Sequence, residues 1–245
     1  MNLYELACHT HSHFFFSVYH TGSFAGKAVE IWHPEKGTTE NASYKIVNEY
    51  TSVTLHLSPN DAVFVVFKDD TKTNSRMLPL LKETIIAKID GDWKLAFQKD
   101  RGAPLQISID KLSSWTDNED AGVKYFSGEG TYSKTIDAPS TWFKNNGTLW
   151  LNLGDVENLA DVVVNGKSLG ILWKKPFRIN VTGVLKPGYN LVVIKVINLW
   201  VNRLIGDRQP GNGKQYTYTT MPFYNASSTL LPSGLLGPVS ISSIE

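Results

Sequence analysis

Residues 160–173 read ADVVVNGKSLGILW, and this stretch decides the fold. β-Branched and apolar residues on both sides of an Asn-Gly pair are typical of two antiparallel strands joined by a tight turn. Asn165 and Gly166 can both adopt the positive φ that a type I′ turn requires. The stretch therefore predicts a β-hairpin centred on these two residues.

The same pattern of short strands continues along the sequence on both sides of this hairpin. Runs rich in Val, Ile, Thr and aromatic residues recur between clusters of Gly, Pro, Asn and Asp, while helical periodicity is nearly absent. After Pro79, about eight runs follow one another at roughly ten-residue spacing, which matches a jelly roll of two antiparallel sheets packed face to face. In LKPGYN, Pro187 and Gly188 predict a further turn. The sequence thus predicts an all-β fold built on an antiparallel β-sandwich.

A polar segment divides the chain. Residues 68–79, KDDTKTNSRMLP, hold charged residues, Ser, Thr and Asn with almost no apolar side chain, which is the composition of a linker. Four further strands are predicted before it, near residues 28–32, 43–47, 52–57 and 62–67. We therefore predict three parts: a small β-rich accessory domain (1–70), a linker (71–85) and the sandwich domain (86–245).

Composition excludes several classes of partner. The chain has 245 residues, a formal net charge of +1 and 19% charged residues, with no basic run of the kind that holds nucleic acid. The longest apolar run, residues 62–67, is far shorter than the ~20 residues of a membrane-spanning helix. The first 20 residues are a poor secretion signal, since no Lys or Arg precedes their apolar part and three His interrupt it. A single Cys excludes an internal disulfide framework. We expect neither a nucleic-acid nor a membrane partner.

Metal-binding and nucleophilic residues give weak signals. His9, His11 and His13 alternate, so on a strand they would share one face about 7 Å apart, but no fourth ligand is indicated. Ser233 lacks the strand, sharp turn and helix that surround a hydrolase serine. We favour an incidental histidine cluster and no nucleophile.

Paired carboxylates offer a route to glycosidic bond cleavage. That reaction needs two of them, separated by about 5 Å or by about 6.5–9.5 Å according to mechanism. Asp155 and Glu157, or Glu119 and Asp120, are the candidate pairs. We favour the alternative that these acids cap backbone donors, or that Asp155 and Glu157 hold a structural calcium, since calcium prefers oxygen ligands.

Binding of carbohydrate is better supported, because the chain has seven Trp and 11% aromatic residues. Flat rings stack on the apolar face of a sugar, while Asn, Arg and Asp hydrogen-bond its hydroxyls. Trp200 shares parity with Val196 in the strand before it and is predicted to lie in the core. Trp173 and Trp142 are predicted to be surface platforms.

Residues 198–211, NLWVNRLIGDRQPG, gather polar groups at the end of an apolar strand. In one interpretation Arg203 donates to Asp207, four residues later, and the pair locks the loop to the sandwich. In the other, Asn198, Asn202 and Arg203 line a shallow groove with Tyr216 or Tyr224 and bind a sugar. Both interpretations are correct if the fold and the sugar use different atoms of these side chains.

The succession DGDWKLAF, VKYFSGEGTYSKTID, residues 149–207 and LLPSGLLGPV resembles the C-terminal sugar-binding-type β-sandwich of glycoside hydrolase family 106. That family contains α-L-rhamnosidases, and its sandwich is similar to the galactose-binding-like jelly roll. VEIWHPEKGTTENASY resembles the β-rich segment that precedes the sandwich in those proteins. The resemblance spans about residues 28–241 and is most specific over 154–207. Trp173, Asn202, Arg203 and Asp207 match the motif.

The resemblance implies a carbohydrate-binding or accessory module without catalytic residues. In the family the catalytic acid and base lie on a large barrel domain upstream, and the first 27 residues here depart from the family pattern, so we expect truncation at the N-terminus. The implied partners are a rhamnose-containing or other plant or bacterial glycan and a catalytic domain, and the family is usually periplasmic or secreted. Two alternatives stay open: rhamnosidase-type activity on this chain, and a purely structural packing module.

Overall fold

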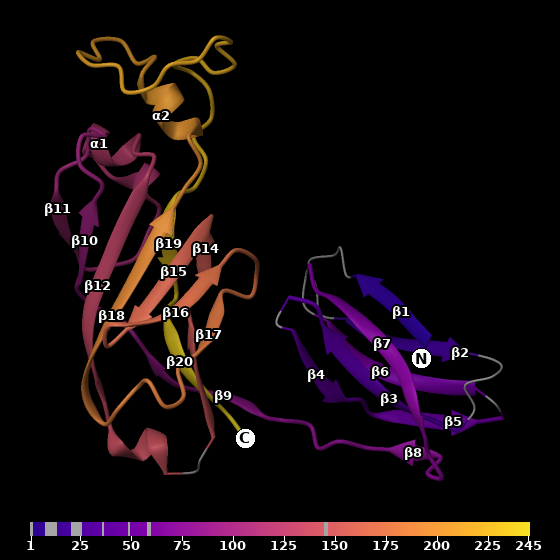
Figure 1. The fold of residues 1–245 in the computed structure, drawn as a ribbon. Coiled ribbons are helices and arrows are strands. Elements are labelled where there is room, and N and C mark those ends of the chain that lie inside the picture. The colour runs from indigo at the N-terminus through magenta and orange to yellow at the C-terminus, as the bar shows by residue number, and fades with distance from the viewer. Residues whose placement is uncertain are drawn as a thin grey trace. The chain divides into compact units, whose positions relative to one another are not determined.

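A computed structural model describes residues 2–7, 14–20, 26–35, 37–48, 50–57, 60–144 and 147–245. The chain forms two compact units, Met1–Leu81 and Lys82–Glu245, and each is built almost entirely of antiparallel strands (Figure 1). In the described part of the chain, no helix is both long and apolar enough to cross a membrane.

The smaller unit contains two four-stranded sheets, in the orders β1-β7-β3-β4 and β2-β6-β5-β8. Its strands are β1 (Asn2–Ala7), β2 (Phe14–His20), β3 (Lys27–His33), β4 (Thr38–Asn41), β5 (Tyr44–Val47), β6 (Tyr50–Leu57), β7 (Ala62–Asp70) and β8 (Ser75–Arg76). Alternate residues of β3 and β6 are buried and form its core, among them Val29, Ile31, Val53 and Leu55. Strand β8 lies inside the predicted linker and pairs with β5.

The larger unit contains a six-stranded sheet, β11-β10-β12-β18-β15-β16, a four-stranded sheet, β17-β13-β20-β9, and the pair β14-β19. The first six of its strands are β9 (Glu83–Lys88), β10 (Trp93–Phe97), β11 (Gln106–Ile109), β12 (Glu129–Ala138), β13 (Thr148–Asn152) and β14 (Asp155–Glu157). The others are β15 (Leu159–Val164), β16 (Lys167–Leu172), β17 (Arg178–Asn180), β18 (Gly188–Ile197), β19 (Gly234–Gly237) and β20 (Ser240–Ile244). This architecture confirms the predicted all-β antiparallel sandwich.

The two predicted turns form as expected. Asn165 (φ 52°) and Gly166 (φ 79°) connect β15 to β16, and Gly188 (φ 87°) opens β18. Asn165 also bonds this turn to Val184 and to β18, because its Nδ2 donates to Val184 O (3.0 Å) and to Asn190 Oδ1 (2.8 Å). Local sequence and tertiary contacts therefore agree at the hairpin.

The core of the larger unit follows the two-residue period of its strands. Leu149 and Leu151 on β13 and Ile194 on β18 are buried, with at most 3% of each residue exposed. Trp150 points to the opposite face from these leucines, where the guanidinium of Arg178 lies 4.9 Å from its ring centroid.

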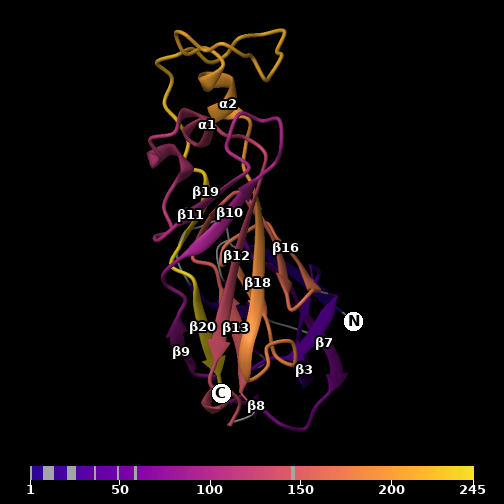
Figure 2. The same ribbon diagram turned by 90° about the vertical axis from the view of Figure 1, so that its left-hand side faces the viewer.

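Short helices gather at one end of the larger unit: α1 (Ala121–Lys124), α2 (Val201–Gly206) and the 3-10 helix η1 (Trp115–Asp117), whereas η2 (Ser140–Phe143) lies at the other end (Figures 1 and 2). Below α1, Trp115 stacks with Tyr132 and meets Phe97 and Phe126 edge-on. The Tyr132 hydroxyl accepts from Trp115 Nε1 (2.6 Å) and Leu235 N (3.0 Å), and burial raises the pKa of Tyr132 well above its usual range. These four aromatic side chains therefore pack together beside the helical end of the larger unit.

Candidate functional site: the helical end of the larger unit

The predicted pair between Arg203 and Asp207 forms at α2. Arg203 Nε donates to Asp207 Oδ1 at 2.9 Å, and the two side chains are only 4% and 2% exposed. The second oxygen, Oδ2, accepts from Tyr216 N (3.0 Å), Thr217 N (2.7 Å) and Thr217 Oγ1 (2.6 Å) rather than from a second guanidinium donor. The pair therefore locks the segment that follows α2, as the first interpretation predicted.

Asn198 and Asn202 also bind the protein itself. Asn198 donates to Phe126 O (2.9 Å) and accepts from Gly128 N (3.0 Å). Asn202 donates to Leu231 O (2.7 Å) and accepts from Leu231 N (2.9 Å). Both amides donate to the buried Ser233 hydroxyl, at 3.2 and 2.7 Å. These contacts join the end of β18 to the segment before β19.

The predicted residues are not collected in a single groove. Asn198 borders one pocket, Asn202 a second, and Arg203 with Tyr216 a third. Tyr224 lies with Asp207 along a fourth, very small concavity. The physical reason is that β18 ends at Ile197 and the chain then coils into α2, so successive polar side chains point in different directions.

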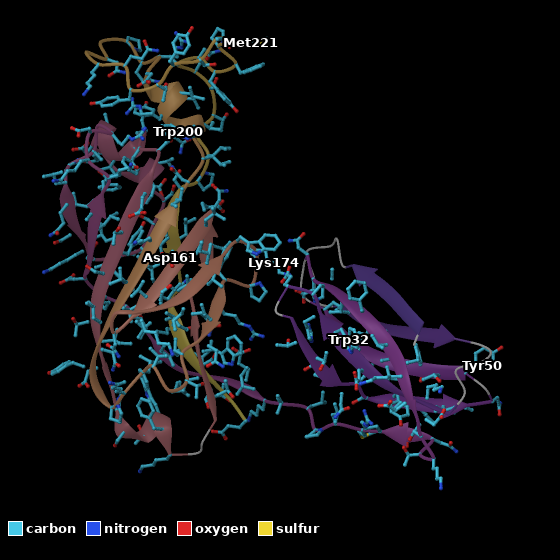
Figure 3. The ribbon with its side chains drawn as sticks, in the orientation of Figure 1. Trp32, Tyr50, Asp161, Lys174, Trp200 and Met221 are labelled. Carbon is cyan, nitrogen blue, oxygen red and sulfur yellow. The ribbon has the colours of Figure 1, made fainter. Side chains whose placement is uncertain are left out.

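The prediction that Trp200 lies in the core is wrong. Trp200 is the residue that precedes α2, in helical backbone conformation, and 44% of it is exposed. The alternation of β18 ends at Ile197, so parity with Val196 no longer applies three residues further on. The Arg101 guanidinium lies 4.7 Å from the Trp200 ring centroid and restrains the ring. Figure 3 shows Trp200 at the helical end, below the loop that carries Met221.

An open pocket of about 410 Å³ adjoins Trp200. Gln98, Glu129 and Thr131 contribute polar side chains to it, while Phe97 and Ile197 contribute apolar surface. Thr131 Oγ1 donates to Glu129 Oε1 at 3.3 Å, which orients the carboxylate. A half-exposed indole ring beside a carboxylate, an amide and a hydroxyl can stack on a sugar ring and hydrogen-bond its hydroxyls. We define these residues, Trp200, Gln98, Glu129 and Thr131, as the Trp200 pocket.

Sequence reasoning missed the Trp200 pocket. Glu129 and Thr131 occupy alternate positions of β12, on the face opposite the buried Tyr132, and this alternation could have placed both on the outer face of the sheet. Nothing local to the sequence brings Trp200 or Gln98 beside them.

The candidate carboxylates have other partners. Asp155 Oδ1 accepts from Lys175 Nζ at 2.5 Å, and this bond raises the pKa of Lys175. Partial burial raises the pKa of Glu157, which the positive charge of Lys175 opposes. Asp120 caps α1 by accepting from Gly122 N (2.7 Å) and Val123 N (3.3 Å), and Glu119 is exposed. Within the described ranges, no group of three or more His, Cys, Asp and Glu residues is placed to hold a metal. Calcium at Asp155 and Glu157 stays a prediction.

Trp173 and Trp142 lie apart from the helical end. Trp173, just after β16, is 59% exposed, and Lys174 Nζ lies 5.7 Å from its ring centroid. Trp142, in η2, is half-buried and packs against the core, so it is a poorer platform than Trp173. His9, His11 and His13 lie outside the described residues.

Comparisons with known proteins relate this architecture to sugar-processing enzymes. No protein-family model matches the chain. The structure of the rhamnosidase from Novosphingobium sp. PP1Y matches 98% of this chain at 41% identity and a TM-score of 0.89, and the match covers 22% of that enzyme. A candidate β-glucuronidase from Formosa agariphila is 37% identical over 62% of this chain and 15% of its own length. The chain is related to glycoside hydrolases.

A weaker match involves the β-glucuronidase of Ruminococcus gnavus, at 20% identity over 69% of this chain and 29% of that enzyme. Its TM-score of 0.46 is too low to support any argument here. The chain thus spans about a fifth of the rhamnosidase and less of the Formosa protein.

Proposed function

We propose that this chain is a non-catalytic accessory module of a rhamnosidase-like glycoside hydrolase, of the family 106 type, and that it binds carbohydrate at the Trp200 pocket. The match to the rhamnosidase supports the relationship, since it covers nearly all of this chain but only 22% of the enzyme. We assign no catalytic residue to this chain and place bond cleavage on another domain.

The Trp200 pocket carries the proposal for binding. Weak carbohydrate sites commonly combine one exposed aromatic ring with a few hydrogen-bonding groups. Here the ring is held in place by Arg101, and Glu129 is oriented by Thr131. The site is therefore largely formed before a ligand arrives, which reduces the entropy lost on binding.

The test is an NMR or calorimetric titration of the whole chain with neutral rhamnose-containing oligosaccharides. We expect millimolar binding by the parent and about five- to tenfold weaker binding by Trp200→Ala, because an aromatic contact contributes about 1 kcal/mol and a factor of ten corresponds to about 1.4 kcal/mol. Trp173→Ala is the matched control, since Trp173 is exposed to a similar degree and lies outside the pocket. Absence of binding to plant and bacterial glycans, or equal affinity of the two variants, would contradict the proposal.

A second candidate function is packing against another domain of such an enzyme. The outer face of the six-stranded sheet exposes Tyr189 (82%), Ile171 (65%), Leu191 (47%) and Ile197 (42%). Apolar side chains exposed on one face of a sheet can provide contacts for another domain. If the packing function is correct, the chain should bind a separately produced remainder of a rhamnosidase-like enzyme, and Leu191→Lys with Ile171→Lys should abolish that binding.

A further inference from the structure

We propose that a second pocket, centred on Arg203, binds the carboxylate of an acidic sugar, that is, a uronic acid residue of a glycan. The proposal rests on the proposed carbohydrate-binding function and assigns it a distinct subsite with its own ligand chemistry. The pocket has a volume of about 290 Å³ and lies between α1, α2 and the segment after α2. Its lining includes Arg203, Tyr125, Tyr216, Gln209 and Asn212.

Arg203 has hydrogen-bond donors that the protein does not use. Only 4% of its side chain is exposed, and Nε is bonded to Asp207. Among the described residues, neither Nη1 nor Nη2 has a hydrogen-bond partner. Neither atom is fully buried. The Nη atoms therefore reach solvent, and the pocket that Arg203 lines is the space that provides it. The Nη donors are therefore available to a ligand that enters this pocket.

The charge around the pocket favours an anion. The carboxylate of Asp207 already accepts four hydrogen bonds, from Arg203, Tyr216 and Thr217, so it does not compete for the Nη groups. Lys124 Nζ lies 6.0 Å from the ring centroid of Tyr125, and Lys214 Nζ lies 4.9 Å from that of Tyr216. Two further cations thus flank the two aromatic rings that line the pocket. Together with Arg203 they outnumber the carboxylates of Asp207 and Asp120, the second of which accepts from the lining residue Gly122.

Five glycines contribute to the pocket wall beside the larger side chains. A Cβ on Gly206 would lie 2.5 Å from Arg203 Nη2, and a Cβ on Gly122 would lie 2.1 Å from Gly102 O, so a side chain at either position would disturb the pocket. At Gly206 the missing side chain leaves room for Arg203 Nη2 and for Tyr125, so this glycine lets the guanidinium pack closely against the end of α1. The Arg203 guanidinium lies over the Tyr216 ring, with Cζ 4.8 Å from the ring centroid, and this contact restricts the orientation of the guanidinium.

Two kinds of group in the pocket, a guanidinium and side-chain amides, match a sugar acid better than a simple anion. The planar pair of Nη groups matches the two oxygens of a carboxylate. Gln209 Nε2 donates to Ala226 O (3.0 Å) and Asn212 Nδ2 donates to Gly206 O (3.0 Å), which fixes both amides. Their side-chain oxygens accept no hydrogen bond from the described residues, so they can accept from ligand hydroxyls. A ligand that offers a carboxylate and hydroxyls on one small ring uses both features.

The experiment compares matched ligands by NMR titration of the whole chain. Glucuronate and galacturonate are titrated against glucose, galactose and sulfate, at low and high salt. We expect the uronates to bind at least tenfold more tightly than the neutral sugars and sulfate, with a salt-dependent affinity and shifts at the Tyr216 and Thr217 amides. Equal affinities for acid and neutral forms, or tighter binding of sulfate than of the uronates, would overturn the proposal.

Variants locate the binding without unfolding the site. Gly213 lines the pocket and is not in the left-handed region, and a Cβ added to it would meet no heavy atom within 4 Å beyond its chain neighbours, so Gly213→Phe fills the opening without strain. Thr220→Phe, on the exposed part of the same segment, is the matched control. We expect uronate binding to be lost in Gly213→Phe and kept in Thr220→Phe and Trp200→Ala. Retention in Gly213→Phe overturns the subsite. Binding of neutral oligosaccharides that depends on Trp200, together with no preference for uronates, also overturns it but leaves the proposed function standing.

Discussion

The Asp207 carboxylate joins α2 to the segment that follows it, and we predict that Asp207→Asn loosens that segment. The carboxylate accepts four hydrogen bonds, and its partner Arg203 is 4% exposed. Asn keeps the shape but replaces one acceptor oxygen with an NH₂ group, which must then face a donor. It also leaves the buried guanidinium without its counter-charge.

The expected magnitude follows from these contacts. A hydrogen bond to a charged group contributes about 1.5–3 kcal/mol, and about 1.4 kcal/mol is a factor of ten, so exchange of the Tyr216 and Thr217 amides should accelerate about 10- to 100-fold. Breaking a buried ion pair by removing one partner costs about 3–5 kcal/mol, and we expect a loss of that order in the free energy of unfolding of the larger unit.

Hydrogen exchange resolved by peptide or by residue measures the first effect, and denaturant unfolding measures the second. The matched control is Asp155→Asn, which breaks an ion pair whose side chains are 55% and 57% exposed. Exposed pairs contribute about 0–1 kcal/mol, so this variant should behave almost like the parent. If Asp207→Asn leaves exchange at residues 216–217 unchanged, or if both variants lose the same stability, our assignment of Asp207 as the lock of this segment is wrong.

Two further predictions concern the sandwich itself. Leu151→Ala should lower the free energy of unfolding by about 2–5 kcal/mol, because Leu151 is 1% exposed within the core, whereas Leu159→Ala, at a position 38% exposed, should cost much less; equal losses by denaturant unfolding would contradict the assigned core. Glu157→Gln should stabilise the protein near neutral pH, because the raised folded-state pKa of Glu157 means that folding disfavours its charged carboxylate. This gain in stability should vanish as the pH falls below the unfolded-state pKa, where both Glu157 and Gln are neutral. A difference in melting temperature that does not depend on pH would refute the prediction.

The features that the sequence predicted are those set by neighbouring residues. The Asn165-Gly166 turn needs only two residues that tolerate positive φ between two apolar runs. The two-residue period of a strand places Trp150 on the face opposite Leu149 and Leu151, and the structure decides that the leucine face is the core. The bond between Arg203 and Asp207 was predictable because the residues are one helical turn apart.

The parts that the sequence did not predict depend on where strands end. The assignment of Trp200 to the core carried the alternation of the apolar strand past Ile197, where β18 ends. One of the two interpretations placed Asn198 and Asn202 in a groove, but their amides bind backbone that comes more than 25 residues earlier or later in the chain. Contacts of that separation leave no local pattern.

By itself, the sequence determined the all-β class, the central hairpin and the alternation that builds the core, because strand period and turn geometry act over a few residues. Only the tertiary structure decided which polar groups are free to bind a ligand. Gln98, Glu129 and Trp200 come from three separate segments, and the free end of Arg203 is visible only once the bonds of Asp207 to Tyr216 and Thr217 are known. Whether a side chain is used by the fold or left for a ligand depends on all of its neighbours in space, and most of these are distant in the chain.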